Sequence, residues 1–142
     1  MGNEKTVRIG IIGCGGIANG KHMPSLRQIP GVQMVAFCDI IEERARKAKQ
    51  DYGTPDGAVY TDYRKLLEDK TIDVVHVCTP NRAHSFITVD ALHAGKHVMC
   101  EKPMAINAAE AKKMLDAAKE TGKLLTIGYQ SRQRADAPHP KP

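Results

Sequence analysis

The sequence predicts an α/β fold, in which a doubly wound parallel sheet of about six strands carries helices on both faces. Short apolar runs alternate with helical patterns along almost the whole chain. Several of these runs are nearly continuous, which is typical of strands that are buried on both faces of a sheet. The 142 residues, 42% of them hydrophobic, suffice for one domain with a real core but not for two domains of ordinary size.

The first half of the chain predicts three strands, each followed by a helix. The strands are apolar, and the helices place apolar residues at helical spacing. Pro30-Gly31 ends the first helix, and Gly53 is placed to end the second. In chain order we expect a strand at 7–13, a helix at 17–28, a strand at 33–38, a helix at 41–52, a strand at 58–60 and a short helix at 63–68.

The second half continues this alternation and then changes character. In chain order we expect a strand at 73–78, a helix at 83–94, a strand at 97–100, a helix at 108–121 and a strand at 124–128, with Gly95 and Gly122 as helix stops. The last residues are rich in proline and predict a loose tail. The expected organisation is a flexible leader at 1–5, one folded domain at 6–130 and a Pro-rich, disordered tail at 131–142.

The composition excludes several classes of function. The formal charge is +5, but basic residues are interspersed with acidic ones, as on solvated helix faces, so we expect no nucleic-acid partner. No stretch approaches the ~20 apolar residues of a membrane span. The four cysteines form no CxxC pair, which favours reduced thiols and a cytoplasmic setting. No spacing of ligands predicts a metal site.

The turn after the first strand fits the pattern G-x-G-x-x-A. Gly13 allows a tight exit from the strand, and Gly15 removes a side chain where the backbone must approach a pyrophosphate. Ala18 lets the helix pack closely against the strand. Together with Gly16 and Ile17, these residues begin a helix whose free N–H groups suit phosphates. The motif predicts that the folded domain binds a dinucleotide, and a purely structural turn is the alternative.

Asp39 follows the second strand, 21 residues after Ala18. A carboxylate at this place can accept hydrogen bonds from both hydroxyls of the adenosine ribose, and it would repel a 2′-phosphate. Ile40 and Ile41 offer no cation to hold such a phosphate, and Arg44 lies further along the helix. We therefore expect NAD as the cofactor, with NADP disfavoured.

Further chemistry is expected where the later strands end, because ligands of open α/β sheets bind beyond the carboxyl ends of the strands. The segments after the fourth, fifth and sixth strands therefore belong together. They contribute Thr79, Pro80, Asn81 and His84, then Glu101 and Lys102, and finally Tyr129 and Gln130.

The sequence resembles the glucose–fructose oxidoreductase / inositol dehydrogenase family over residues 6–132. The GxGxxA motif, Asp39, "CTPNRAH" and "GKHVMCEKPMA" carry the resemblance, and EKP is its most specific part. The resemblance implies a Rossmann nucleotide domain joined to a C-terminal domain with a large, mostly antiparallel sheet. It also implies oxidation of a sugar or polyol hydroxyl, or reduction of the ketone, with a nicotinamide cofactor.

The resemblance also implies roles for individual residues. Lys102 is similar to the family's catalytic lysine beside the nicotinamide, where an ammonium can polarise the alcohol oxygen. Glu101 would hold the nicotinamide end or orient Lys102. The other implied cofactor contacts are Thr79, Pro80 and Asn81 beside the nicotinamide ribose, and His84, Tyr129 and Gln130 around the same pocket.

Some of these residues have a structural alternative. Spacing alone allows Glu101 and Lys102 to form a surface ion pair, which would contribute little. Asn81 can cap the helix that follows it, in addition to a cofactor contact or in place of one. His84 is placed in the first turn of that helix and is as well explained by a structural role.

The histidines and cysteines elsewhere are interpreted as structural. His22 lies on the first helix, at a position that is often histidine in such chains, and His76 lies inside a strand, where a satisfied core residue is expected. Cys38, Cys78 and Cys100 all end strands and gather at one edge of the sheet. We interpret them as small apolar packing residues rather than a metal cluster.

The chain ends where the family continues for about 200 further residues, the size of a second domain. The family's substrate pocket and proton-transfer groups belong to that part. We therefore expect little or no turnover by this chain alone. Three explanations stay open: an excised or truncated domain, a short protein that works with a partner chain or by self-association through an exposed apolar face, and a product without function.

Three functions are compatible with these observations. The first is an NAD-dependent oxidoreductase of a sugar, polyol or glycoside hydroxyl, of which this chain is the cofactor-binding part. The second is an NAD(H)-binding module that regulates or recruits a partner without turnover. The third is an NAD-dependent glycosidase that acts by transient oxidation and elimination.

Overall fold

The sheet consists of six parallel strands in the order β3-β2-β1-β4-β5-β6. The computed structural model describes residues 6–79, 83–101 and 107–128. The strands are β1 (Val7–Ile12), β2 (Val32–Cys38), β3 (Ala58–Tyr60), β4 (Val74–Val77), β5 (His97–Glu101) and β6 (Leu125–Gly128). This order and direction are those of a Rossmann sheet, so the predicted fold class is confirmed.

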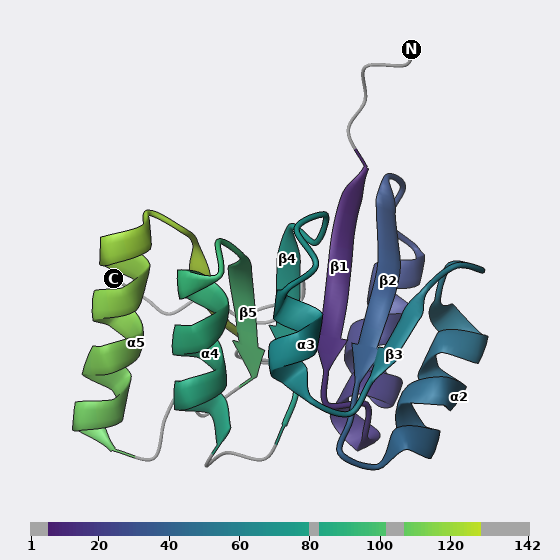
Figure 1. Cartoon of the computed structure of the whole chain (residues 1–142), viewed down its shortest axis with the longest axis horizontal. Helices are drawn as coiled ribbons and strands as arrows, with labels where there is room; N and C mark the ends of the chain where they lie inside the picture. The colour runs from purple at the N-terminus through teal and green to yellow at the C-terminus, as the bar shows by residue number, and fades with distance from the viewer. Residues whose placement is uncertain (1–5, 80–82, 102–106, 129–142) are drawn as a thin grey trace, which may run out of the picture.

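Helices cover both faces of the sheet (Figure 1). One face packs against the first two helices of the chain, and the other face packs against the last three. The helical elements are a π-helical turn, η1 (Ala18–His22), followed by α1 (Met23–Arg27), α2 (Glu42–Tyr52), α3 (Tyr63–Leu67), α4 (His84–His93) and α5 (Ala108–Thr121). The predicted elements are thus all present, with ends that differ by a few residues.

The winding of the chain reverses between β1 and β4, which are neighbours at the centre of the sheet. β2 and β3 continue the sheet on one side, and β5 and β6 continue it on the other. Because the strands are parallel, their carboxyl ends form one edge, at the bottom of Figure 1. In open α/β sheets the ligand crevice lies at such a reversal, so the site is expected where β1 and β4 end.

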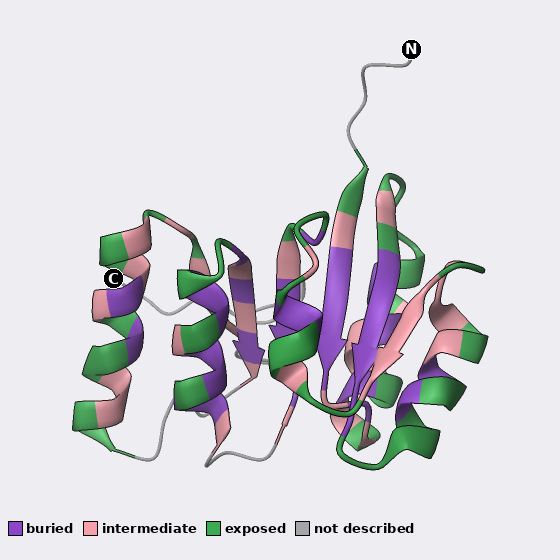
Figure 2. Ribbon diagram, viewed as in Figure 1, coloured by how far each residue is buried: buried purple, intermediate pink, exposed green. Residues whose placement is uncertain are grey.

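The central strands are buried on both faces, as their continuous apolar runs predict. Ile11 is fully buried against the side chains of α1 and α2, and its neighbour Ile12 is 2% exposed among the side chains of α3, α4 and α5. Figure 2 shows the same division, with buried central strands and with helices that are buried only on their inward sides. The two clusters hold β1 rigidly in the middle of the domain.

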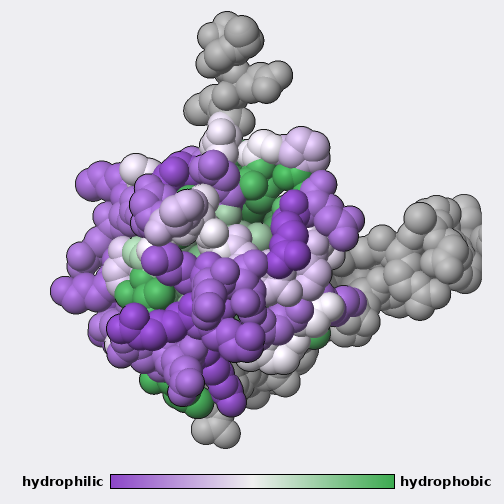
Figure 3. All heavy atoms as spheres, turned by 90° about the vertical axis from the view of Figure 1, so that its right-hand side faces the viewer, coloured by the Kyte–Doolittle hydropathy of each residue, from purple (hydrophilic) through white to green (hydrophobic). Residues whose placement is uncertain are grey.

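The charged stretches form solvated helix faces, as the sequence indicates. On α2, Arg46 pairs with Glu42, and Lys47 Nζ lies 3.0 Å from Asp51 Oδ2. Both pairs join residues four positions apart, and such exposed pairs contribute only a few tenths of a kcal/mol. The side of the molecule that carries α2 and β3 is mostly hydrophilic (Figure 3). Cations and anions both lie on the exposed face of α2, which therefore carries mixed charge.

The first helix differs from the prediction of one regular helix at 17–28. It begins with the π-helical turn η1, in which the N–H of Met23 donates to the carbonyl of Ala18, five residues earlier. Pro24 follows in the first turn of α1. Proline has no N–H to donate and its ring clashes with the carbonyl four residues earlier, so a wider turn fits better here than a regular α-helix. His22 is the last residue of this turn.

Candidate functional site

Gly13 leaves β1 in a conformation that other residues avoid. Its φ angle is +94°, and a Cβ atom added there would lie 2.8 Å from the carbonyl carbon of Cys78. The turn after β1 therefore packs directly against the backbone at the end of β4. The fold itself requires glycine at this position.

Gly15 and Gly16 are different, because the protein does not require a glycine at either position. Neither has a positive φ angle. A Cβ atom on Gly15 would meet only Arg44 Nη1, at 3.8 Å, and one on Gly16 would meet nothing within 4 Å. The loop thus leaves open space above its backbone, which is what the close approach of a pyrophosphate needs. Of the other motif residues, Ala18 is fully buried and Ile17 half-buried.

Asp39 ties the end of β2 to the glycine loop. Its Oδ2 accepts a hydrogen bond from the backbone N–H of Cys14 at 2.8 Å, and its Oδ1 accepts one from the N–H of Ile41 at 2.8 Å. The residue is 8% exposed. A carboxylate has about four acceptor positions, so these two bonds leave capacity for the hydroxyls of a ribose. The sequence does not indicate that Asp39 also holds the glycine loop through these backbone hydrogen bonds.

Asn19 holds the same loop from the helix side and was missed in the sequence. Its Nδ2 donates to the carbonyls of Cys14 and Gly15, at 2.8 and 2.9 Å. These bonds turn both carbonyls toward the helix. A polar amide one turn into the helix after a glycine motif is the signal that could have identified it.

The end of β4 is fixed by His84. Its Nε2–H donates to the carbonyl of Thr79 at 2.7 Å, and the side chain is 1% exposed. The observed contact positions residue 79, and a direct contact between His84 and a cofactor stays a prediction. Thr79 Oγ1 is buried and has no hydrogen-bond partner in the described part of the chain. A buried hydroxyl without a partner is unusual in proteins, which makes Thr79 a candidate contact for a bound ligand.

Glu101, at the end of β5, contacts a histidine from the first helix. Its Oε2 lies 2.8 Å from His22 Nε2, and His22 Nδ1 lies 2.8 Å from His76 Nδ1 on β4. The side chains of His22 and Glu101 are 8% and 13% exposed. Glu101 is thus paired with His22, and the alternative of a surface ion pair between Glu101 and Lys102 is not tested, because Lys102 lies outside the described residues.

Five of the predicted site residues lie outside the described residues, and their predicted roles are not tested by the geometry. They are Pro80, Asn81, Lys102, Tyr129 and Gln130.

The cysteines are buried free thiols. Burial, followed by the nearby charge of Asp39, raises the pKa of both Cys14 and Cys38 to about 12. Burial raises the pKa of Cys100 to about 11. These thiols are therefore neutral and behave as small packing residues. Within residues 6–79, 83–101 and 107–128, no group of three or more His, Cys, Asp or Glu residues could hold a metal ion.

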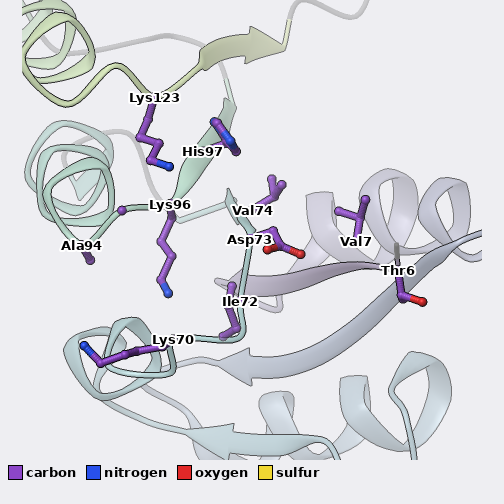
Figure 4. Close-up of a pocket in the computed structure, with 11 residues that line it drawn as sticks. Thr6, Val7, Lys70, Ile72, Asp73, Val74, Ala94, Lys96, His97 and Lys123 are labelled. Atoms are coloured by element: carbon purple, nitrogen blue, oxygen red, sulfur yellow. The ribbon is translucent and has the colours of Figure 1, made fainter. Parts of the chain in front are cut away.

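A hollow of about 490 Å³ lies at the opposite edge of the sheet (Figure 4). It is lined by residues at the amino ends of β1, β4, β5 and β6, among them Asp73, Lys96 and Lys123. Lys96 Nζ donates to the carbonyl of Asp69 at 2.5 Å. Because ligands of open α/β sheets bind at the carboxyl ends of the strands, this hollow is at the wrong edge for the expected cofactor.

No helix in the described part of the chain combines the length and the apolar character that crossing a membrane requires.

Comparison with known proteins agrees with this geometry. A family model described as "Oxidoreductase family, NAD-binding Rossmann fold" matches residues 7–129. Inositol 2-dehydrogenase of Salmonella typhimurium is 37% identical over 128 residues, which are 89% of this chain and 38% of that protein. D-glucoside 3-dehydrogenase of Escherichia coli is 37% identical over 130 residues, which are 92% of this chain and 36% of that protein.

A similar solved structure is that of a 3-ketoreductase from Actinomadura kijaniata in complex with NADP and TDP-benzene. It has a TM-score of 0.86 and 30% sequence identity, over 93% of this chain and 40% of that chain. The chain therefore spans less than two fifths of the length of the curated relatives named above.

Proposed function

The chain belongs to the oxidoreductase family with an NAD-binding Rossmann fold, and from this membership we propose that it is the cofactor-binding part of an enzyme acting on a sugar, polyol or glycoside hydroxyl. The observation that carries the proposal is the open space above the backbone of Gly15 and Gly16. Packing within the protein does not explain why these two residues are glycines. Inositol and glucoside dehydrogenases among the relatives support the substrate class.

The residues present fit a nicotinamide dinucleotide. The pyrophosphate would lie over the Gly15 backbone, at the start of a helix whose first N–H groups have no partner within the helix. The adenosine ribose would lie beside Asp39, and the unpaired hydroxyl of Thr79 would face the nicotinamide half. A bound nicotinamide supplies the site with a hydride acceptor, or in its reduced form with a hydride donor.

Within the NAD(P) class we propose a preference for NAD. The Asp39 carboxylate lies where a 2′-phosphate would be placed, and it would repel that phosphate. The similar 3-ketoreductase was solved with NADP, and Arg44 Nη1 lies near Gly15, so a cation is within reach of the loop. In this proposal the Asp39 carboxylate sets the preference for NAD over NADP, and the positive charge of Arg44 makes that preference smaller.

At the other end of the cofactor, we propose Lys102 as the catalytic residue. It follows Glu101 directly at the end of β5, the strand next to β4. As an ammonium beside the reacting hydroxyl, Lys102 would stabilise the developing negative charge on oxygen; as a neutral amine, it would instead accept the hydroxyl proton. Pro80, Asn81, Tyr129 and Gln130 are proposed to surround the nicotinamide half.

Two further proposals concern setting and partners. The buried free thiols agree with a reducing, cytoplasmic setting. Leu115 and Leu124 are 52% and 69% exposed near the β6 edge of the sheet. Exposed apolar side chains at a sheet edge would suit a second domain, a partner chain or a homodimer.

Calorimetric titration of the chain with NADH and with NADPH tests the proposal. We expect both to bind, with NADH tighter. A panel of sugars and polyols, followed by absorbance of the reduced nicotinamide, then tests for turnover, of which we expect little or none from this chain alone. Turnover would indicate an enzyme rather than a binding module; its loss in Lys102→Ala would support the catalytic assignment, and its survival would contradict it. Failure of both cofactors to bind below millimolar concentration would overturn the proposed function.

A further inference from the structure

Two histidines and a carboxylate from three separate elements meet at the carboxyl edge of the sheet. His22 ends η1, His76 lies in β4 and Glu101 ends β5. Because side chains alternate along a strand, His76 and Glu101 lie on the same face of the sheet. Val75, Val77 and Cys100 pack under α3, α4 and α5, so their neighbours His76 and Glu101 point to the opposite face, where η1 lies.

The three side chains form one hydrogen-bonded chain with His22 in the middle. His22 Nε2 bonds to Glu101 Oε2 and His22 Nδ1 bonds to His76 Nδ1, each at 2.8 Å. The two rings meet edge to face, with centroids 5.1 Å apart and planes at 89°. Both nitrogens of His22 are thus occupied, and the position of its ring is fully determined by its two partners.

The protons of this chain can be assigned from the partners. An ionised Glu101 only accepts, so His22 Nε2 carries a hydrogen. Between the two Nδ1 atoms one donates and one accepts. Either His76 donates to a neutral His22, or a doubly protonated His22 donates to His76. The second state differs by one proton on His22 and by the tautomer of His76, and every hydrogen bond is kept.

His76 does not take this extra proton itself. Burial, with a smaller effect from His22, lowers the pKa of His76 to about 3. Among the described residues, the other titratable groups around the site are the thiols of Cys14 after β1, Cys78 after β4 and Cys100 in β5. Burial raises the pKa of each of these thiols, so they stay neutral. Within the part of the chain that the structure describes, the charge of this edge is therefore set by His22 and Glu101.

We propose that His22, held by His76, is a positioning residue that fixes the Glu101 carboxylate at the nicotinamide end and, by gaining or losing a proton, sets the charge that the nicotinamide ring meets. This inference rests on the proposed function, since it places the nicotinamide ring beside Glu101. The pair of His22 and Glu101 carries one negative charge when His22 is neutral and no net charge when His22 is protonated.

This change of charge distinguishes the two redox forms of the cofactor. The nicotinamide ring of NAD⁺ is positively charged, and that of NADH is neutral. A negative pair therefore favours NAD⁺ over NADH, and protonation of His22 removes this preference. The ratio of the two dissociation constants should therefore depend on pH.

The test is the ratio of the dissociation constants of NAD⁺ and NADH, measured at pH 6.0 and 8.5 by calorimetry. For the unaltered chain we expect the ratio to rise by about threefold to tenfold as the pH is lowered, because only NAD⁺ loses an attraction. His22→Gln can still donate to Glu101 but cannot gain a proton, so its ratio should not depend on pH. His93→Gln is the matched control, because His93 is 50% exposed and pairs with Glu120.

Each outcome decides between the two proposals. A ratio that does not change with pH in the unaltered chain overturns this inference, and so does a full pH dependence in folded His22→Gln. If neither cofactor binds to the unaltered chain, the proposed function fails and this inference fails with it. A role of His22 in folding alone would lower the thermal midpoint of His22→Gln and leave the pH dependence of the ratio in place.

Discussion

The two ends of the candidate cofactor site each carry a carboxylate, and the two are held in different ways. Asp39 accepts hydrogen bonds from two backbone N–H groups, which cannot change their charge. Glu101 is paired with His22, which can. Under the proposed function, the adenosine end would therefore meet a fixed negative charge, and the nicotinamide end would meet a charge that His22 can change. The difference suits a cofactor whose adenosine half is constant and whose nicotinamide half changes charge in the reaction.

The largest expected effect is the loss of stability when Asp39, the carboxylate held by backbone N–H groups, is replaced. Asp39→Ala leaves the N–H groups of Cys14 and Ile41 without their acceptor, and each such loss costs about 1–3 kcal/mol. We expect a fall of about 2–4 kcal/mol in the free energy of unfolding, measured by urea denaturation. Asp56→Ala, at an exposed loop position, is the control and should change little. An equal, small loss in both variants would show that Asp39 does not hold the loop.

The buried, neutral His76 beside His22 should appear in the pH dependence of stability. The pKa of His76 is lowered to about 3 in the folded chain, from 6.5. Between these values the unfolded chain binds more protons, so stability is full above pH 6.5 and falls as the pH is lowered toward 3. Urea denaturation at several pH values should show a slope of up to about 1.4 kcal/mol per pH unit from this residue. His76→Gln should make the slope shallower, whereas an unchanged slope would contradict a buried, neutral His76.

A smaller effect is expected on the preference between NADH and NADPH when the charge of Asp39 is removed. Asp39→Asn keeps the size of the side chain and removes its charge, so the repulsion of a 2′-phosphate is lost. We expect the preference for NADH over NADPH to fall by about threefold to tenfold, as a ratio of dissociation constants. Using the ratio cancels any general weakening of the loop. If the ratio stays constant, Asp39 is not beside the ribose.

The sequence predicts the fold well because its signals are local. Continuous apolar runs mark the strands, and Gly13 marks a turn that only glycine can make. The first helix is the exception, since Pro24 favours a π-helical turn that the spacing of apolar residues does not reveal. Local patterns thus predict elements better than they predict irregular turns.

The candidate site is only partly predictable because its key contacts are long-range. His22 lies 54 residues from His76 and 79 from Glu101, so a helix position and a strand position give no sign that they meet. Strand alternation predicts that His76 and Glu101 share one face, but His22 lies in a π-helical turn that the sequence pattern does not reveal. Local patterns therefore favour a structural interpretation of both histidines.

The central claim is that the space above Gly15 belongs to the cofactor. It is tested most directly by titrating NADH into the unaltered chain, Gly15→Leu and Gly20→Leu. Neither glycine has a positive φ angle or a close neighbour, so both variants should keep the thermal midpoint within a few degrees. We predict that Gly15→Leu weakens NADH binding by at least about tenfold and that Gly20→Leu binds normally. Normal binding by a folded Gly15→Leu would contradict the account.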